Sequence, residues 1–135
     1  MIASKSFFDI NPIIIGVDVT YSFVARFGKN NNLPITEETA VNLLRLLEIE
    51  YHTFYKAINE MVEKLETKEG VRVTSNDFPF SIIVKVALSS ERDYWIELSL
   101  PWLKEIGENS FTEEIRSVQN NKHVSQRVRH LLLKL

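Results

Sequence analysis

The feature that most constrains the fold is an apolar pattern in the middle of the chain. Its residues recur at alternating spacings of four and three, and they are Ala40, Leu44, Leu47, Tyr51, Phe54, Ile58, Met61 and Leu65. Residues at this spacing form one stripe of an α-helix, because the helix has about 3.6 residues per turn. Thr36 is suited to cap the N-terminus of such a helix, and Gly70 can end it in the left-handed conformation. We therefore predict one long helix over residues 37–68.

This helix is long for a chain of 135 residues. Thirty residues or so at about 1.5 Å per residue span about 45 Å, whereas a domain of this length has a radius of gyration of about 14 Å. Because aromatic side chains suit a tight two-stranded coiled coil poorly, we expect the middle of the helix to lie on a sheet. The excess length should join a second copy, since dimers are the commonest closed assembly. The predicted partner-binding seam of this homodimer is Leu44, Leu47, Tyr51, Phe54, Ile58 and Met61.

Alternation with a period of two predicts the strands of an antiparallel sheet. One long strand is expected over residues 13–27, with a bulge near Gly16. Further strands are expected over 71–75, 80–88 and 94–100, the last two forming a hairpin around the polar residues 89–93. Pro101 is expected either to end the last strand or to start a short turn of helix through Trp102 and Ile106. We interpret residues 1–135 as a single α+β domain with the helices on one face of the sheet.

A second helix is predicted over residues 111–134. Ser110 and Glu113 have the spacing of a capping box, and the residues that follow include a stripe of apolar side chains three or four positions apart. The stripe comprises Ile115, Val118, Val124, Val128, Leu131 and Leu135. Its spacing lapses at Asn120 and Asn121, which leaves open a break in the helix there.

Composition excludes several classes of protein and site. The chain has no cysteine, which rules out disulfides, thiolate metal ligands and a cysteine nucleophile. Its apolar runs are too short to cross a bilayer, and the first residues lack the pattern of a signal peptide. We therefore expect a cytoplasmic protein without a membrane partner.

The C-terminal end of the chain is basic, although the net charge of the whole chain is −2. The candidate contacts for an anionic partner or nucleic acid are Lys122, His123, Arg127, His130 and Lys134. These cations can also simply be solvated and favour the C-terminus of a helix. Because the sequence pI is about 5.9 and no aromatic residue is present here to stack on bases, nucleic-acid binding stays open but is not favoured.

The sequence predicts no enzyme. Glu48 and His52 are one helical turn apart and could orient a general base or supply two metal ligands, but no third ligand accompanies them. A surface ion pair is the favoured interpretation. We accordingly assign no catalytic, cofactor-binding or metal-binding residue.

Two apolar residues, Ile83 and Trp95, fall on the face of the predicted hairpin that should be polar. A third, Trp102, lies just beyond the hairpin. They form either an exposed apolar patch, which would suit a protein interface, or a surface that another segment covers. Together with the long helix, this pattern favours a non-enzymatic protein–protein interaction module of regulatory, adaptor or inhibitor type that self-associates. The alternative is a nucleic-acid-binding regulator that uses the basic C-terminal helix.

Overall fold

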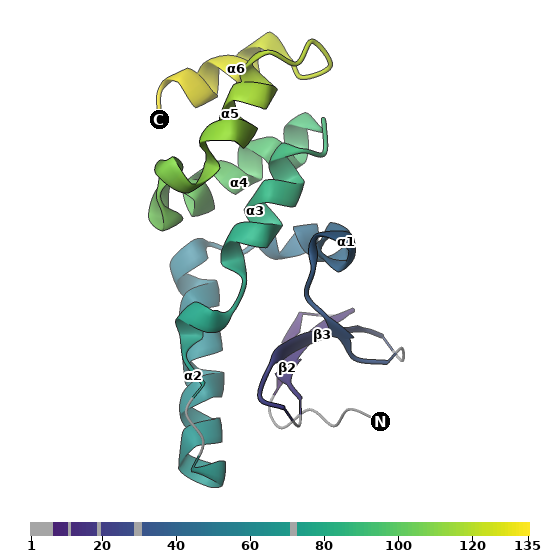
Figure 1. Cartoon of the computed structure of the whole chain (residues 1–135), viewed down its shortest axis with the longest axis vertical. Coiled ribbons are helices and arrows are strands. Elements are labelled where there is room, and N and C mark those ends of the chain that lie inside the picture. Colours follow the sequence, from purple (N-terminus) through teal and green to yellow (C-terminus); the bar gives the residue numbers. More distant parts are fainter. Residues whose placement is uncertain (1–6, 11, 19, 29–30, 71–72) are drawn as a thin grey trace. The chain divides into compact units, whose positions relative to one another are not determined.

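The computed structural model describes residues 7–10, 12–18, 20–28, 31–70 and 73–135, and it confirms an α+β protein (Figure 1). The chain groups into two compact units. Unit 1 comprises Met1–Thr39 and His52–Pro79, and unit 2 comprises Ala40–Tyr51 and Phe80–Leu135. Each unit is therefore assembled from segments that are separated in the sequence. The single domain expected from the chain length stays a prediction.

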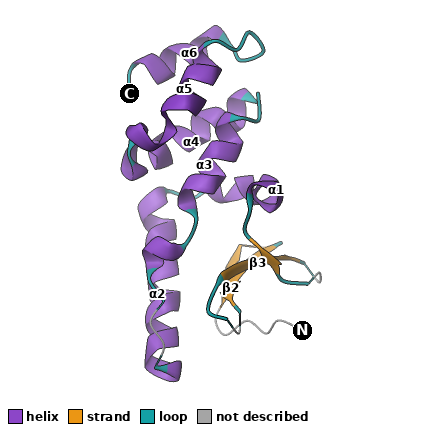
Figure 2. Cartoon of the chain, in the orientation of Figure 1, coloured by secondary structure: helices purple, strands orange, loops and turns teal. Residues whose placement is uncertain are grey.

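Unit 1 carries the sheet, whose strands are coloured orange in Figure 2. Its described strands are antiparallel neighbours in chain order: β1 Phe7–Ile10, β2 Ile13–Val17, β3 Phe23–Phe27 and the short β4 Leu33–Pro34. The expected single strand over 13–27 is thus wrong, since β2 and β3 form a hairpin in which Val17 pairs with Phe23. The expected bulge at Gly16 is also wrong, because Gly16 pairs regularly with Phe7 and Val24.

The single strand was predicted wrongly because the turn between β2 and β3 has an odd number of residues. Directly paired residues share one face of a sheet, and here odd-numbered residues pair with odd-numbered ones, as Ile15 does with Ala25. The turn between the two strands has five residues. The buried side chains of the alternating pattern therefore occupy odd-numbered positions both before and after the turn. Alternation alone cannot distinguish this hairpin from one continuous strand. Val19, in the turn, lies outside the described residues.

The carboxylate of Asp18 organises the described part of this turn. Its Oδ1 accepts hydrogen bonds from the N–H of Thr20 (2.9 Å), the hydroxyl of Thr20 (2.6 Å) and the N–H of Ser22 (3.0 Å). Burial raises the pKa of Asp18, but these hydrogen bonds to the ionised form outweigh burial and leave the pKa below its ordinary value. The turn also places Tyr21 in the left-handed region, at φ +63°.

Helix α2 (Tyr51–Glu69) supplies the other side of the unit 1 core. Phe54, Ile58 and Met61 are buried, and the ring of Phe78 packs edge-on against both Phe54 and Phe23, with centroids 5.4 Å apart in each pair. The aromatic rings thereby join α2 to β3. Gly70 ends the helix as predicted, with φ +69° and its N–H bonded to a carbonyl of the last turn.

The strand expected over 71–75 is not observed where the structure describes it. Residues 71 and 72 lie outside the described residues, residues 73 and 74 are in no strand, and Ser75 begins the short 3₁₀ helix η2 (Ser75–Asp77). The hydroxyl of Ser75 donates to the Asn59 side chain of α2 at 2.7 Å. This contact, together with the side-chain cap that Thr74 and Asp77 form on η2, holds the segment against the helix instead of against a sheet.

Unit 2 is helical throughout its described secondary structure. Its elements are η1 Val41–Glu48, α3 Phe80–Leu88, α4 Asp93–Ile106, η3 Glu108–Phe111, α5 Thr112–Gln119 and α6 Gln126–Leu133. The strands expected over 80–88 and 94–100 are therefore wrong. Both segments contain buried residues four positions apart, Phe80, Val84 and Leu88 in one and Ile96 and Leu100 in the other. A spacing of four fits a strand and nearly fits a helix, so it did not discriminate between them. Pro101 lies inside α4, so it neither ends a strand nor starts a helix.

The predicted helix over 37–68 is interrupted. Its start is confirmed, because Thr36 and Thr39 cap α1 (Glu37–Ala40) reciprocally, each side-chain oxygen accepting the N–H of the other residue. The chain then continues as η1, and at Ile49 it becomes extended, with φ −93° and ψ 137°, before α2 begins. The indole N–H of Trp102 donates to the Ile49 carbonyl at 3.1 Å. A hydrogen bond from a side chain far along the sequence thus satisfies a carbonyl that the helix would otherwise have used.

The predicted helix over 111–134 is two helices. They separate at Asn120 and Asn121, where the apolar spacing lapses, and Ser125 caps α6 by accepting the N–H of Val128 at 3.2 Å. The expected capping box of Ser110 and Glu113 is wrong, because Ser110 lies inside η3. Among the described residues, no helix combines the length and apolarity that a membrane span requires.

Candidate functional site

Polar contacts tie the basic C-terminal segment to α4. The N–H of Ser125 donates to Asp93 Oδ1 at 3.0 Å, and this bond is the main reason that the pKa of Asp93 lies below its ordinary value. One turn further along α4, Glu97 receives both terminal nitrogens of Arg127, at 3.0 and 3.1 Å. That hydrogen-bonded pair raises the pKa of the guanidinium. The α4 carboxylates therefore hold the start of α6 in place.

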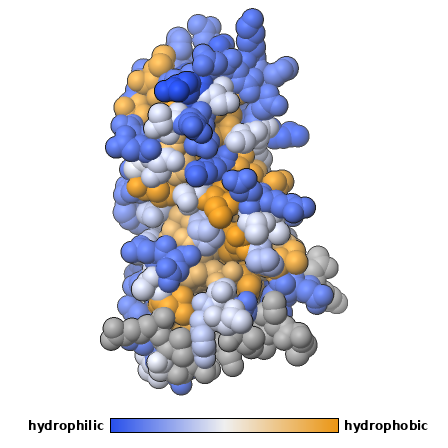
Figure 3. All heavy atoms as spheres, viewed as in Figure 1, coloured by the Kyte–Doolittle hydropathy of each residue, from blue (hydrophilic) through white to orange (hydrophobic). Residues whose placement is uncertain are grey.

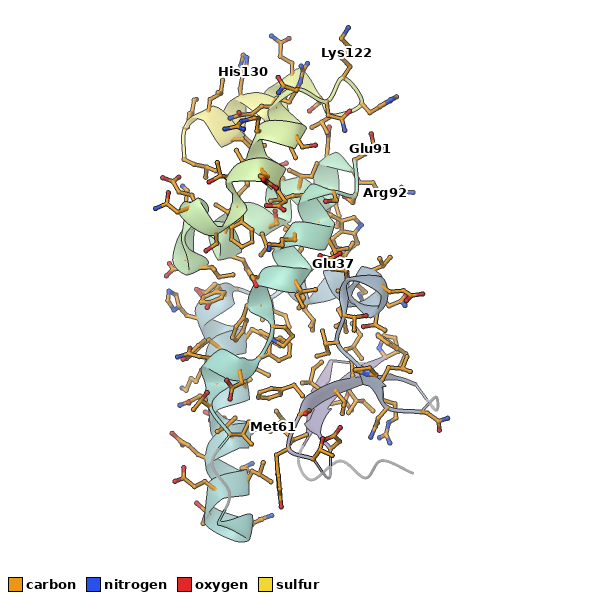
Figure 4. All side chains as sticks on the ribbon, viewed as in Figure 1. Glu37, Met61, Glu91, Arg92, Lys122 and His130 are labelled. Carbon is orange, nitrogen blue, oxygen red and sulfur yellow. The ribbon has the colours of Figure 1, made fainter. Side chains whose placement is uncertain are left out.

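The predicted anion-contact residues are consequently not equivalent. Lys122, His123, His130 and Lys134 are exposed, and the side chains of Lys122 and His130 extend away from the helices (Figure 4). Figure 3 shows that mostly hydrophilic residues cover this end of unit 2. Arg127 is also exposed, but both terminal nitrogens of its guanidinium are hydrogen-bonded to Glu97. An anionic partner would have to compete with that carboxylate for Arg127.

A second arrangement, which the sequence did not predict, lies between η1 and α4. We call Arg45, Glu48, Tyr94 and Trp95 the Tyr94 cluster. The Tyr94 hydroxyl donates to Glu48 Oε2, and the other oxygen of Glu48 lies 3.6 Å from Arg45 Nε. The rings of Tyr94 and Trp95 pack edge to face, with centroids 4.8 Å apart. These contacts hold one large ring in a defined position.

The ring of Tyr94 is nevertheless open to solvent, since the residue is 55% exposed. Its hydrogen bond to Glu48 is the main reason that the phenol pKa is raised above its ordinary value of 10.0; burial and the charge of Glu48 add to the effect, and Arg45 opposes it. The phenol therefore stays protonated as a donor near neutral pH. A fixed, exposed aromatic side chain beside an arginine has the composition of a protein-interaction hot spot.

Local structure explains how the cluster forms. In a 3₁₀ helix, side chains three positions apart lie almost over one another, which aligns Arg45 with Glu48 while Leu44 and Leu47 are buried. Tyr94 and Trp95 occupy the first turn of α4. The hairpin expected over residues 80–88 and 94–100 gives no indication of this cluster, because it would place Tyr94 beside a neighbouring strand and not beside η1. Its contact with Glu48 spans 46 positions, for which no local pattern exists.

The structure places the predicted dimer seam inside the chain. Leu44 and Leu47 are buried in η1, and Phe54, Ile58 and Met61 are buried in α2. Tyr51 is half-buried, with its ring 5.5 Å from the rings of Phe80 and Trp102. These side chains belong to the cores of two different units and not to one exposed stripe. Self-association stays a prediction, and in this conformation it would need another surface.

The predicted apolar patch is only partly present. Ile83 and Trp102 are buried, so neither contributes to an exposed surface. Trp95 is half-buried and belongs to the Tyr94 cluster. Trp102 packs against Tyr51 and Phe80 and uses its indole N–H internally. Ile83 and Trp102 therefore form no exposed patch, and they lie in the helices α3 and α4 instead of on a face of a sheet.

The Glu48 carboxylate contacts Tyr94 and Arg45, and the extended Ile49 ends the helical spacing on which its pairing with His52 depended. Within the described part of the chain, no group of three or more histidine, aspartate or glutamate side chains is placed to hold a metal ion.

No family model, curated protein or solved structure matches this chain.

Proposed function

We propose that this chain is a small, non-enzymatic protein–protein interaction module of regulatory, adaptor or inhibitor type that acts in the cytoplasm. It binds through the Tyr94 cluster, and a second copy of the chain is the simplest partner. The observation that supports the proposal is the Tyr94 ring, which is more than half exposed although its hydroxyl and one ring edge are held by neighbours.

A ring held in this way is suited to binding. Association costs free energy when side chains lose their freedom of rotation, and a side chain that is already fixed loses less. Tyrosine, tryptophan and arginine are the residues most often responsible for binding energy at protein interfaces. The Tyr94 cluster contains all three, with Arg45 also exposed.

The nucleic-acid alternative is less well supported. Glu97 occupies Arg127, and Asp93 and Glu91 contact the same C-terminal segment through Ser125 and Asn121. Carboxylates so close to the basic residues oppose the approach of phosphates. A steep loss of binding to a labelled duplex as salt rises would favour this alternative.

Sedimentation velocity over a range of protein concentrations tests the proposal. We expect a reversible dimer whose dissociation constant rises by about tenfold or more in Tyr94→Ala, which corresponds to about 1.4 kcal/mol. Leu33→Ser is the matched control, because Leu33 is an exposed apolar residue of β4 in unit 1. A chain that stays monomeric at every concentration, or a dimer that both variants weaken equally, would overturn the proposal for a second copy.

A further inference from the structure

Arg129 of α6 is half-buried, and one nitrogen of its side chain has no partner among the described residues. The Nε of Arg129 is covered from solvent and makes no hydrogen bond there. Arg127, two positions earlier, has both terminal nitrogens on Glu97. Leaving a charged donor without an acceptor costs free energy. An acceptor that reached the guanidinium of Arg129 would lower that cost.

The surroundings of Arg129 are suited to such an acceptor. A pocket of about 230 Å³ is lined by Gln119 at the end of α5 and by Gln126, Arg129, His130 and Leu133 of α6. The four α6 residues have the spacing of one helical face. Two amides, an imidazole and a guanidinium can all donate hydrogen bonds, and the lining contains no carboxylate. The pocket is therefore rich in donors and lacks negative charge.

We propose that this pocket binds an oxyanion, either a carboxylate or a phosphate group. The terminal nitrogens of an arginine guanidinium form a planar fork of donors that matches two oxygens of such a group. Gln126 and His130, on the same face of α6, and Gln119, on α5, supply further donors at the rim. The inference is independent of the Tyr94 cluster, because it concerns other elements, α5 and α6, and a different class of ligand.

Nuclear magnetic resonance of the full chain tests this directly, because the Nε–H of an arginine gives its own signal. Inorganic phosphate and acetate are titrated separately at constant ionic strength, with chloride as the balancing salt. We expect the Arg129 Nε–H signal to shift saturably with at least one of them. The anion that saturates at the lower concentration identifies the phosphate or the carboxylate as the preferred group.

Two variants sharpen the test. Arg129→Gln should weaken the apparent affinity about tenfold or more, which is about 1.4 kcal/mol. Arg92→Gln should leave the affinity unchanged, because Arg92 is an exposed arginine in the turn before α4, away from the pocket lining (Figure 4). Shifts that rise linearly without saturation, or that are equal in Arg129→Gln and the wild type, would overturn the proposal. If Arg129→Gln fails to fold, the wild-type titration decides by itself.

Discussion

The indole of Trp102 holds the main chain at the point where the predicted long helix is interrupted. Its N–H reaches the carbonyl of Ile49, while its ring packs on Tyr51 and Phe80. A helix through Ile49 would have used that carbonyl for its own hydrogen bond. The buried tryptophan therefore both fills the core of unit 2 and satisfies the polar group that the interruption leaves free.

Trp102→Phe separates these two roles, since phenylalanine keeps much of the apolar contact and removes the donor. We expect the free energy of unfolding to fall by about 1–3 kcal/mol, as for a partly buried carbonyl that loses its partner. Urea denaturation followed by circular dichroism measures the loss. Trp95→Phe is the control, because Trp95 is only half-buried. An equal loss in both variants would show that the Ile49 contact contributes little.

Side chains of α4 join this helix to α6. They accept hydrogen bonds from α6 and from the turn that precedes α6. Asp93 receives the N–H of Ser125, the residue that also caps α6. Glu97 receives Arg127, and the side chains of that pair are 46% and 62% exposed. Exposed ion pairs contribute little on average, about 0–1 kcal/mol. The Asp93 contact is the one expected to give the pair of helices a dependence on pH.

The direction of that dependence follows from the lowered pKa of Asp93. A carboxyl that holds its proton less tightly when folded stabilises the fold fully above its ordinary pKa of 3.8, and the contribution is lost as pH falls through the folded pKa. We expect unfolding free energies, measured by urea titration from neutral to strongly acidic pH, to fall less steeply on the acid side in Asp93→Asn.

Some acid dependence should persist in that variant, because the pKa of Asp18 is lowered as well. Glu108→Gln controls for the loss of one negative charge, since Glu108 is exposed beyond the other end of α4. An acid-side slope that is the same in Asp93→Asn and the wild type would show that the Ser125 contact is not formed in solution.

Considered as a complete chain, the protein divides one apolar pattern between two cores. Leu44 and Leu47 are buried in unit 2, whereas Phe54, Ile58 and Met61 are buried in unit 1. In the sequence their spacing is that of one helix face. The units are connected by the chain at three places, after Thr39, Tyr51 and Pro79. Substitutions of single buried residues test whether the two units unfold together.

Ile58→Ala removes a fully buried side chain of unit 1, at a cost of about 2–5 kcal/mol. Because Ile58 belongs to unit 1, we expect amide hydrogen exchange to quicken mainly there. Leu47→Ala should give the opposite pattern, with faster exchange mainly in unit 2. Loss of protection across all amides in both variants would instead support the single cooperative domain predicted from the chain length.

The sequence by itself determined which apolar side chains along the middle of the chain need to be covered, and it located features that depend on near neighbours. The Thr36 cap and the end of α2 at Gly70 are examples, and the lapse in apolar spacing at Asn120 and Asn121 left open the break that separates α5 from α6. Each depends on residues within a few positions, so local propensity is sufficient to predict it. The α+β class followed from the same kind of pattern, although two of the segments that suggested strands are helices.

Only the tertiary structure decided the features that depend on distant partners. The interruption at Ile49 depends on Trp102, 53 positions later, and the position of Tyr94 depends on Glu48, 46 positions earlier. The choice between helix and strand at Phe80–Leu88 depended on burial against other elements, because apolar residues four apart fit both. In the sequence Arg127 is one of several basic residues near the C-terminal end, whereas in the structure it forms an ion pair with Glu97. Such pairings exist only after folding brings the segments together, so no periodic pattern in the sequence predicts them.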